Sequence, residues 1–201
     1  MYLPFRYSKN IEKQILWYFL ALLFCFKRYE YVLDVGCGYA QNIRFIRFNF
    51  YMGIDIDNKR ILKNKEKFNG KKFNFFQHDI IKNKFLYKKD FDLILLIQVM
   101  TNSLFSKKEV TKGLQNLIKI MKGTLIFNTS SKNKKDIMEI ENMLRISNIK
   151  YKKIYYGLPS FIRKIKIPII SQLISFICLI LIFANNRFFN KEKIIYICKI
   201  N

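Results

Sequence analysis

The chain has 201 residues, of which 51% are hydrophobic and 25% are charged. This composition excludes a disordered tail, and the length allows one domain whose core needs no disulfides or metal. Lysine and arginine number 37 against 14 aspartates and glutamates, which gives a net charge of +23. Such a charge favours a nucleic acid or an anionic membrane face as partner, although an AT-rich genome would also raise the lysine content.

The cysteines and the single histidine indicate neither a metal site nor a disulfide framework. Cys25, Cys37, Cys178 and Cys198 include no pair with CxxC spacing, and His78 is the one histidine. We therefore expect no structural zinc ion and a reducing cytosolic environment.

The first predicted element is an apolar helix from about Asn10 to Lys27. Its centre, Ile15 to Phe26, is apolar on all sides. These twelve residues are too few to cross a bilayer, which needs about 20. A helix that is apolar all round must be buried or must face a membrane.

Short apolar runs and helical spacings then alternate from Tyr29 onward. Helices are expected over Gln41–Phe48, Asn58–Phe68, Lys107–Met121 and Lys134–Ser147. Strands are expected over Tyr31–Val35, Tyr51–Ile56, Phe73–His78, Phe91–Ile97, Thr124–Asn128, Ile149–Tyr156 and Lys193–Ile200. This alternation predicts an α/β fold, a Rossmann-like doubly wound sheet with helices on both faces.

An apolar helical insertion is expected within residues 158–190, before the last strand. Its centre, Ile167–Ala184, carries no charge and as a helix would be about 27 Å long. Three interpretations stay open: a helix against an anionic membrane, a helix in the core or a dimer interface, and a transmembrane anchor. An anchor would separate Lys193–Ile200 from the sheet. The flanking residues Arg163, Lys164, Lys166 and Arg187 are basic.

The most informative stretch is Val32–Ala40, where an apolar strand runs into a glycine turn. Glycines at 36 and 38 let the backbone turn sharply and approach a ligand without a Cβ in the way. Nineteen residues after Gly36, the second strand ends at Asp55. An acid at this place can accept hydrogen bonds from both ribose hydroxyls of a nucleoside.

Two nucleoside ligands compete for this motif. A dinucleotide site requires GxGxxG, and position 41 is Gln, so the pattern fails. Asp34, two residues before the first glycine, suits a positively charged amino group better than a pyrophosphate. S-adenosylmethionine has such a group and no phosphate.

At four segments the sequence resembles the class I S-adenosylmethionine-dependent methyltransferases, in particular small type 11-like domains. These are LDVGCGYA, GIDID, QHDI at Gln77–Ile80 and FDLILLIQVMTNS at Phe91–Ser103. Their order and spacing cover roughly residues 29–130, the expected cofactor-binding core of one domain over 1–201. The resemblance implies a seven-stranded sheet whose last strand is antiparallel and lies beside the fifth.

The resemblance also implies roles for the matching residues. Gln98 and Asn102 would position the methyl acceptor, with Gln98 also beside the cofactor. In the methionine half of the cofactor site, Asp34 would lie at the ammonium, Gly36, Cys37 and Gly38 along the methionine part, and Tyr39 at the cationic centre. In the adenosine half, Asp55 would lie at the ribose and Asp79 at the adenine amino group. Ile56 and Ile80 would pack on the adenine ring.

Two departures from the family pattern bear on activity. Ala40 replaces a third glycine, and because alanine is small, cofactor binding survives if φ stays negative there. Gln98 and Asn102 replace the acid and the histidine of many relatives, so the obvious general base is missing and catalysis would rest on placement. Asp57 is expected to cap the following helix, and His78 to be a packed residue at a strand end.

The resemblance favours methyl transfer to an O or N acceptor of a small or lipid-linked metabolite, in the cytoplasm or at the inner membrane face. An RNA methyltransferase is the alternative, although the chain lacks the Asn/Asp-Pro-Pro-Tyr and Pro-Cys motifs of two such groups. A non-catalytic cofactor-binding scaffold also stays open, as do the acceptor and the oligomeric state.

Overall fold

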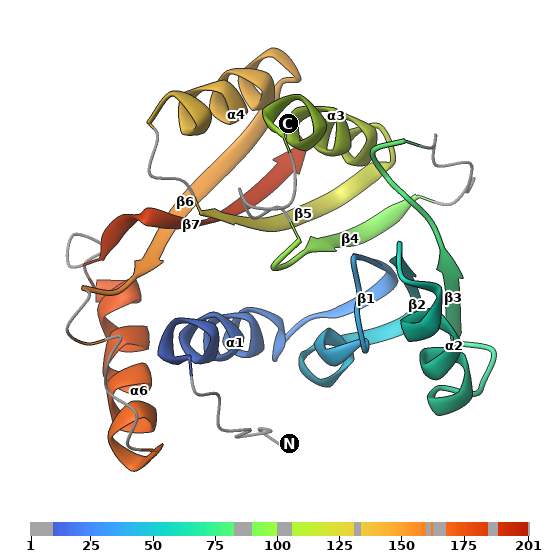
Figure 1. Ribbon diagram of the computed structural model, residues 1–201, viewed down its shortest axis with the longest axis horizontal. Helices are drawn as coiled ribbons and strands as arrows, with labels where there is room; N and C mark the ends of the chain where they lie inside the picture. Colours follow the sequence, from blue (N-terminus) through green and yellow to red (C-terminus); the bar gives the residue numbers. More distant parts are fainter. Residues whose placement is uncertain are drawn as a thin grey trace.

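Seven strands form a single sheet. The computed structural model describes residues 10–82, 90–99, 106–130, 134–159, 162, 168–184 and 189–200. The strands are β1 (Arg28–Val35), β2 (Arg47–Asp55), β3 (Phe73–Gln77), β4 (Phe91–Leu96), β5 (Met121–Ser130), β6 (Ile149–Gly157) and β7 (Asn190–Ile200). Their order is β3-β2-β1-β4-β5-β7-β6, and β7 runs antiparallel to β5 and β6 (Figure 1). The predicted seven-stranded sheet with an antiparallel last strand is confirmed.

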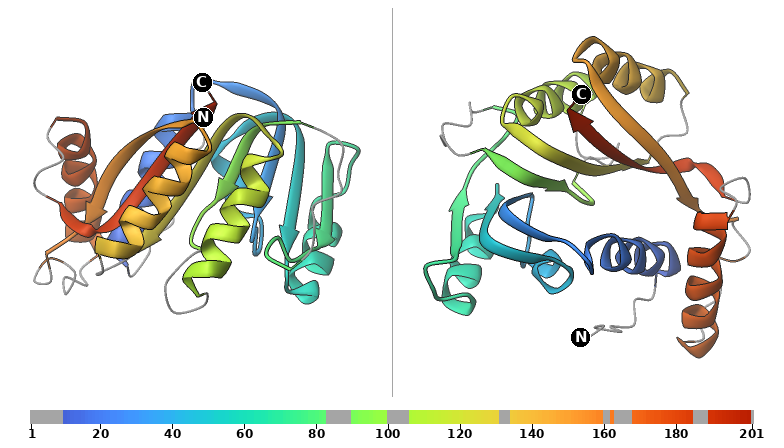
Figure 2. Two further views of the ribbon diagram at one scale, coloured as in Figure 1. Left: turned by 90° about the horizontal axis from the view of Figure 1, so that it is seen from above. Right: turned by 180° about the vertical axis from the view of Figure 1, so that it is seen from behind.

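Helices cover both faces of this sheet. They are α1 (Ile11–Phe24), the 3₁₀ turn η1 (Gln41–Phe45), α2 (Asn58–Lys67), α3 (Lys107–Ile118), α4 (Lys134–Ile146) and α6 (Pro168–Ala184). One face carries α3 and α4, and the other carries α1 and α2 (Figures 1 and 2). Each face therefore has its own hydrophobic core, and the central strands are buried on both sides.

Local polar residues explain where three of the helices begin. Asn10 accepts a hydrogen bond from the Lys13 amide at 3.1 Å. Asp57 accepts from the second and third amides of α2, as predicted for a helix cap. Ser106 and Glu109 form a reciprocal capping box at the start of α3.

The helix predicted over Gln41–Phe48 is wrong. Only η1 forms there, and β2 begins at Arg47 instead of Tyr51. The first pair between β1 and β2 is Arg28 with Arg47, so β2 extends along the whole of β1. Hydrogen bonding to a neighbouring strand has overridden the helical spacing of the local sequence.

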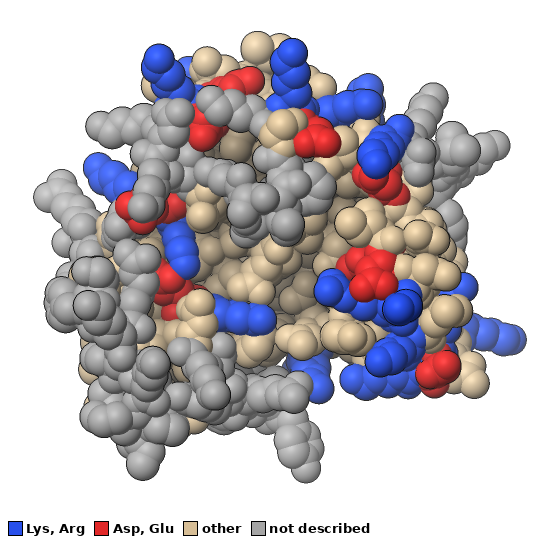
Figure 3. Space-filling model, viewed as in Figure 1, with Lys and Arg blue, Asp and Glu red and all other residues tan. Residues whose placement is uncertain are grey.

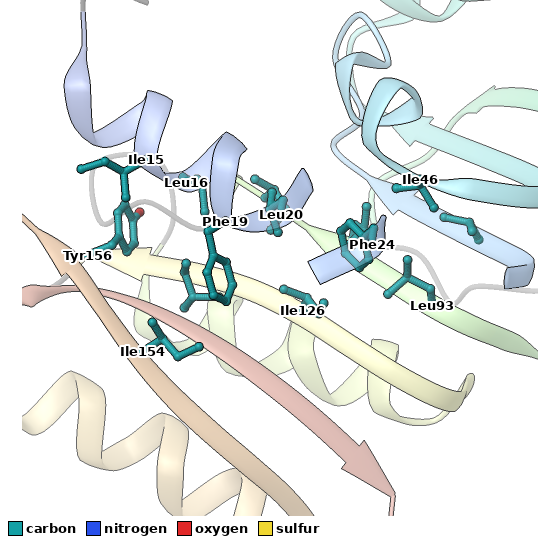
Figure 4. Close-up of a cluster of buried hydrophobic side chains, with 14 of the residues drawn as sticks. Ile15, Leu16, Phe19, Leu20, Phe24, Ile46, Leu93, Ile126, Ile154 and Tyr156 are labelled. Atoms are coloured by element: carbon teal, nitrogen blue, oxygen red, sulfur yellow. The ribbon is translucent and has the colours of Figure 1, made fainter. Parts of the chain in front are cut away.

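The apolar surface of α1 is covered on two sides. Leu16, Phe19 and Phe24 point toward the sheet, where Ile126 and Ile154 lie (Figure 4). A second side of α1 packs against α6, which follows β6 at the edge of the sheet (Figure 1). Both helices therefore belong to one core, and no helix within the described residues has the length and apolar character to span a membrane.

One buried carboxylate ties the first turn of α1 to the edge of the sheet where the parallel strands end. Glu12 is 3% exposed. It accepts a hydrogen bond from the Leu158 amide at 2.9 Å and forms an ion pair with Lys193 at the start of β7. Since β7 is antiparallel, its start lies at the carboxyl edge of the parallel strands. The N-terminus of α1 is thereby fixed at that edge.

Candidate functional site

A hollow of about 160 Å³ opens where β1, β2 and β4 end. The chain leaves β1 toward β2 on one side and reaches β4 on the other, so the strand order reverses between β1 and β4. Ligands of open α/β sheets bind at such a switch point. The residues that line the hollow are Val35, Gly36, Asp55, Ile56, Arg60, His78, Asp79, Ile80, Ile81, Gln98 and Val99.

Six of the residues predicted from the sequence therefore surround one space: Gly36, Asp55, Ile56, Asp79, Ile80 and Gln98. Four others do not line it, namely Asp34, Cys37, Gly38 and Tyr39. Asn102 lies outside the described residues. The hollow also includes Arg60 and Val99, which the sequence did not single out.

Within the hollow, Gly36 is a position where only glycine fits. Its φ is +65°, and a Cβ added there would lie 2.3 Å from Cγ2 of Val99. Gly38 has a similar φ of +54°, but the nearest atom to its added Cβ is 4.0 Å away. Ala40 has φ +51°, so the condition of a negative φ is not met at this residue, which does not line the hollow. The turn holds an alanine in a conformation that costs roughly 1–2 kcal/mol.

Asp55 forms the buried floor of the hollow and is 5% exposed. One of its carboxylate oxygens accepts from the Gly38 amide at 2.8 Å, and the other accepts from the Asp57 amide at 2.9 Å. A carboxylate has about four acceptor sites, so two bonds leave capacity for a ligand. Beside it, Ile56 exposes 59% of its surface at the same hollow.

Asp34 is buried behind the glycine turn rather than in the hollow. Both of its oxygens accept from Asn42 Nδ2 at 3.1 Å, and the Tyr51 hydroxyl donates to one of them. Burial raises the pKa of Asp34 to about 7, against the lowering effect of these two donors. The side chain thus links β1 to η1 and β2.

The loop after β3 is held by its own turn and by α3. Asp79 accepts from the amides of Ile81 and Lys82 at 2.9 and 3.2 Å. The Ile80 carbonyl accepts from Asn116 of α3 at 2.7 Å. The amide of His78 donates to the Asp55 carbonyl at 3.0 Å, and its ring lies edge-on to Phe76, while the residue also lines the hollow.

Arg60 and Val99 enter the hollow from segments that lie far apart in the sequence. Arg60 extends from the first turn of α2, where its Nε lies 3.1 Å from Asp57. Its guanidinium also lies 5.8 Å from the centre of the Tyr39 ring. Only the meeting of α2 with the loop after β4 shows that both residues line one space, so the sequence alone carried no signal for them.

The hollow at the switch point of this sheet defines the class of protein as a doubly wound α/β domain that binds its ligand at the carboxyl ends of the strands. Residues 27–165 match the family described as a methyltransferase domain, and the chain therefore belongs to that family. It is therefore a methyltransferase domain, and the solved structures that resemble it include S-adenosylmethionine-dependent methyltransferases and complexes with S-adenosyl-L-homocysteine. A search of curated protein sequences gave no match.

Three solved structures illustrate the resemblance. The N-methyltransferase NodS from Bradyrhizobium japonicum, in complex with S-adenosyl-L-homocysteine, has a TM-score of 0.59 at 14% identity, covering 94% of this chain and 85% of that one. A TehB-like methyltransferase from Corynebacterium glutamicum has a TM-score of 0.60 at 13% identity, covering 96% and 89%. The plantazolicin methyltransferase BpumL has a TM-score of 0.54 at 18% identity, covering 96% and 83%. At these identities the likeness is one of fold.

Proposed function

We propose that this enzyme transfers the methyl group of S-adenosylmethionine to an oxygen or nitrogen atom of a small or lipid-linked metabolite. The observation that carries the proposal is the buried carboxylate of Asp55 beside the glycine turn at Gly36 and the exposed side chain of Ile56. A nucleoside suits this set, because its ribose hydroxyls can donate to the carboxylate and the flat ring of its base can pack on Ile56.

Four residues would hold the adenosyl part. Asp55 would accept hydrogen bonds from the ribose hydroxyls, and Ile56 and Ile80 would contact the ring. Asp79 would accept from the adenine amino group. The backbone at Gly36 would pass beneath the methionine part, where any side chain would meet Val99. Asp34 would reach the ammonium group only through an intervening water.

Placement of the acceptor would supply the catalysis. When bound, S-adenosylmethionine provides a methyl group that is already a strong electrophile. Gln98 lines the same hollow and carries an amide that can orient a hydroxyl or an amine. Alignment of acceptor and methyl can contribute about 7–11 kcal/mol. Asn102, outside the described residues, keeps the same proposed role.

The test follows transfer of a labelled methyl group. The enzyme is incubated with methyl-labelled S-adenosylmethionine in three separate reactions. One contains small metabolites, one a lipid extract and one size-fractionated RNA. We expect label in the metabolite or lipid fraction and none with Asp55→Ala. If the wild type binds S-adenosylhomocysteine but labels no fraction, the chain is a non-catalytic scaffold and the proposal fails.

RNA is the second candidate acceptor because α2 is strongly basic and lies beside the hollow. The helix carries Lys59, Arg60, Lys63, Lys65 and Lys67, with Arg60 in the lining. Lysine and arginine side chains gather over α2, at the lower right of Figure 3. If the labelled methyl group enters only the RNA fraction, the acceptor is RNA and the proposal of a metabolite acceptor is wrong.

The finer proposal of a lipid-linked acceptor at an anionic inner membrane face rests on α6. Its exposed large side chains recur at helical spacing and form one apolar stripe, 47–60% exposed: Leu173, Phe176, Ile177 and Ile180. The helix carries no charge. A net charge of +23 repels a second copy of the chain and attracts anionic lipid, so a membrane surface is the occupant that fits the stripe.

Flotation with vesicles tests this docking surface. We expect the protein to float with vesicles of phosphatidylcholine and phosphatidylserine at low salt, and Phe176→Glu to remain at the bottom. The matched control is Met138→Glu, which places the same charge on a residue of α4 that is 60% exposed. A wild type that stays at the bottom, or two variants that float equally, would contradict the docking surface.

A further inference from the structure

Gln98 is held in a backbone conformation that a residue with a side chain seldom adopts. Its φ is +61°. Ile97 before it is 7% exposed, and Val99 after it packs against Gly36. The left-handed turn therefore joins a buried strand end at Ile97 to two residues, Gln98 and Val99, that both line the hollow. Such strain persists only where the surroundings hold the backbone in place.

Asn128 on β5 supplies that restraint. Its Oδ1 accepts a hydrogen bond from the Gln98 amide at 2.6 Å, and its Nδ2 donates to the Tyr156 hydroxyl at 2.7 Å. Because Oδ1 and Nδ2 have different partners, the amide of Asn128 has one preferred orientation. Asn128 is 3% exposed and Tyr156 is 4% exposed, so the bond between these two side chains is shielded from water.

Tyr156 is itself fixed from two directions. It belongs to β6, on the far side of β7 from Asn128, and its ring lies beside Ile15 of α1 (Figure 4). Burial is the main cause that raises the pKa of Tyr156, to about 12, and the negative charge of Glu12 adds to it. The hydroxyl therefore stays neutral throughout the physiological range and keeps its place as an acceptor.

We propose that Asn128 and Tyr156 are positioning residues for methyl transfer, acting through the backbone of Gln98. Neither side chain lines the hollow, so neither is expected to touch the cofactor or the acceptor. Their effect is to hold the turn at Gln98, which sets where its amide meets the acceptor. The inference rests on the proposed role of Gln98 and extends the site to β5, β6 and α1.

The test compares Asn128→Ala, Gln98→Ala and the double variant in transfer to the labelled acceptor fraction. We expect each single variant to lower kcat about ten-fold. The double variant should be no slower than the slower single variant, since both changes remove one interaction. The Kd for S-adenosylhomocysteine should change by less than about three-fold. Tyr156→Phe should show a smaller loss of kcat, because Asn128 keeps its bond to Gln98.

Hydrogen exchange at the Gln98 amide provides a second measurement that does not depend on activity. We expect exchange at least about ten-fold faster in Asn128→Ala, with core strands as protected as in the wild type. Additive losses of kcat, or an unchanged exchange rate at Gln98, would overturn the inference. If Gln98→Ala leaves kcat unchanged while exchange rises in Asn128→Ala, the restraint exists and the proposed role of Gln98 fails instead.

Discussion

Gly36→Ala is expected to abolish binding of S-adenosylhomocysteine and to destabilise the enzyme. The new Cβ would lie 2.3 Å from Cγ2 of Val99 in a backbone held at φ +65°. The conformation alone costs roughly 1–2 kcal/mol. Because Val99 and Gly36 both line the hollow, relief of the overlap must move the turn or the loop after β4. Calorimetric titration and thermal unfolding measure the two effects.

Gly38→Ala is the matched control for this substitution. Its φ of +54° imposes a similar backbone cost, while its added Cβ has open space. We expect it to lose roughly 1–2 kcal/mol of stability and to retain binding. Removal of both Cγ atoms in Gly36→Ala/Val99→Ala leaves only the Val99 Cβ, at 3.3 Å, and should restore part of the binding. Equal affinities for Gly36→Ala and Gly38→Ala would show that the overlap with Val99 does not matter.

Asp55→Ala is expected to weaken S-adenosylhomocysteine binding by about 10²–10⁴-fold. Hydrogen bonds from two ribose hydroxyls to a carboxylate contribute about 1.5–3 kcal/mol each. The substitution also removes the acceptors of the Gly38 and Asp57 amides, so the glycine turn loses a support. Asp55→Asn retains one acceptor oxygen, so its affinity for S-adenosylhomocysteine should lie between that of the wild type and that of Asp55→Ala.

The control for this prediction is Asp57→Ala, two residues further along. Asp57 caps α2 and does not line the hollow. We expect its replacement to cost about 1 kcal/mol of stability and to leave the affinity unchanged. Measurement of both quantities for each variant separates loss of the ligand's hydroxyl contacts from general loss of structure. Wild-type affinity in Asp55→Ala would refute the assignment of the ribose to this carboxylate.

The central strands could be predicted because burial on both faces requires unbroken apolar runs. Leu93, Leu95 and Leu96 are fully buried, as expected for the middle of a parallel sheet. The glycine turn and the acid after β2 were also visible, since positive φ and hydrogen bonding to a nucleoside restrict the residue types at these places. Asp57 was predictable as a cap because its bonds reach only two and three residues along the chain.

Other features depended on contacts between distant segments. Pairing with β1 turned the predicted helix over Gln41–Phe48 into η1 and the start of β2. The burial of Asp34 depends on Asn42 and Tyr51, which neither hydropathy nor spacing relates to it. The apolar sequence of α6 was compatible with a place in the hydrophobic core or at a membrane surface. Its packing against α1 decided which side of the helix is covered by protein.

The sequence by itself determined where the strands and most of the helices lie along the chain and which residues form the glycine turn, because these follow from local geometry and from burial. Tertiary structure decided which predicted residues share the hollow, how far β2 extends, and that Asn128 restrains Gln98. The physical reason is that such contacts join residues tens of positions apart. Their energies depend on positions in space that no short stretch of sequence encodes.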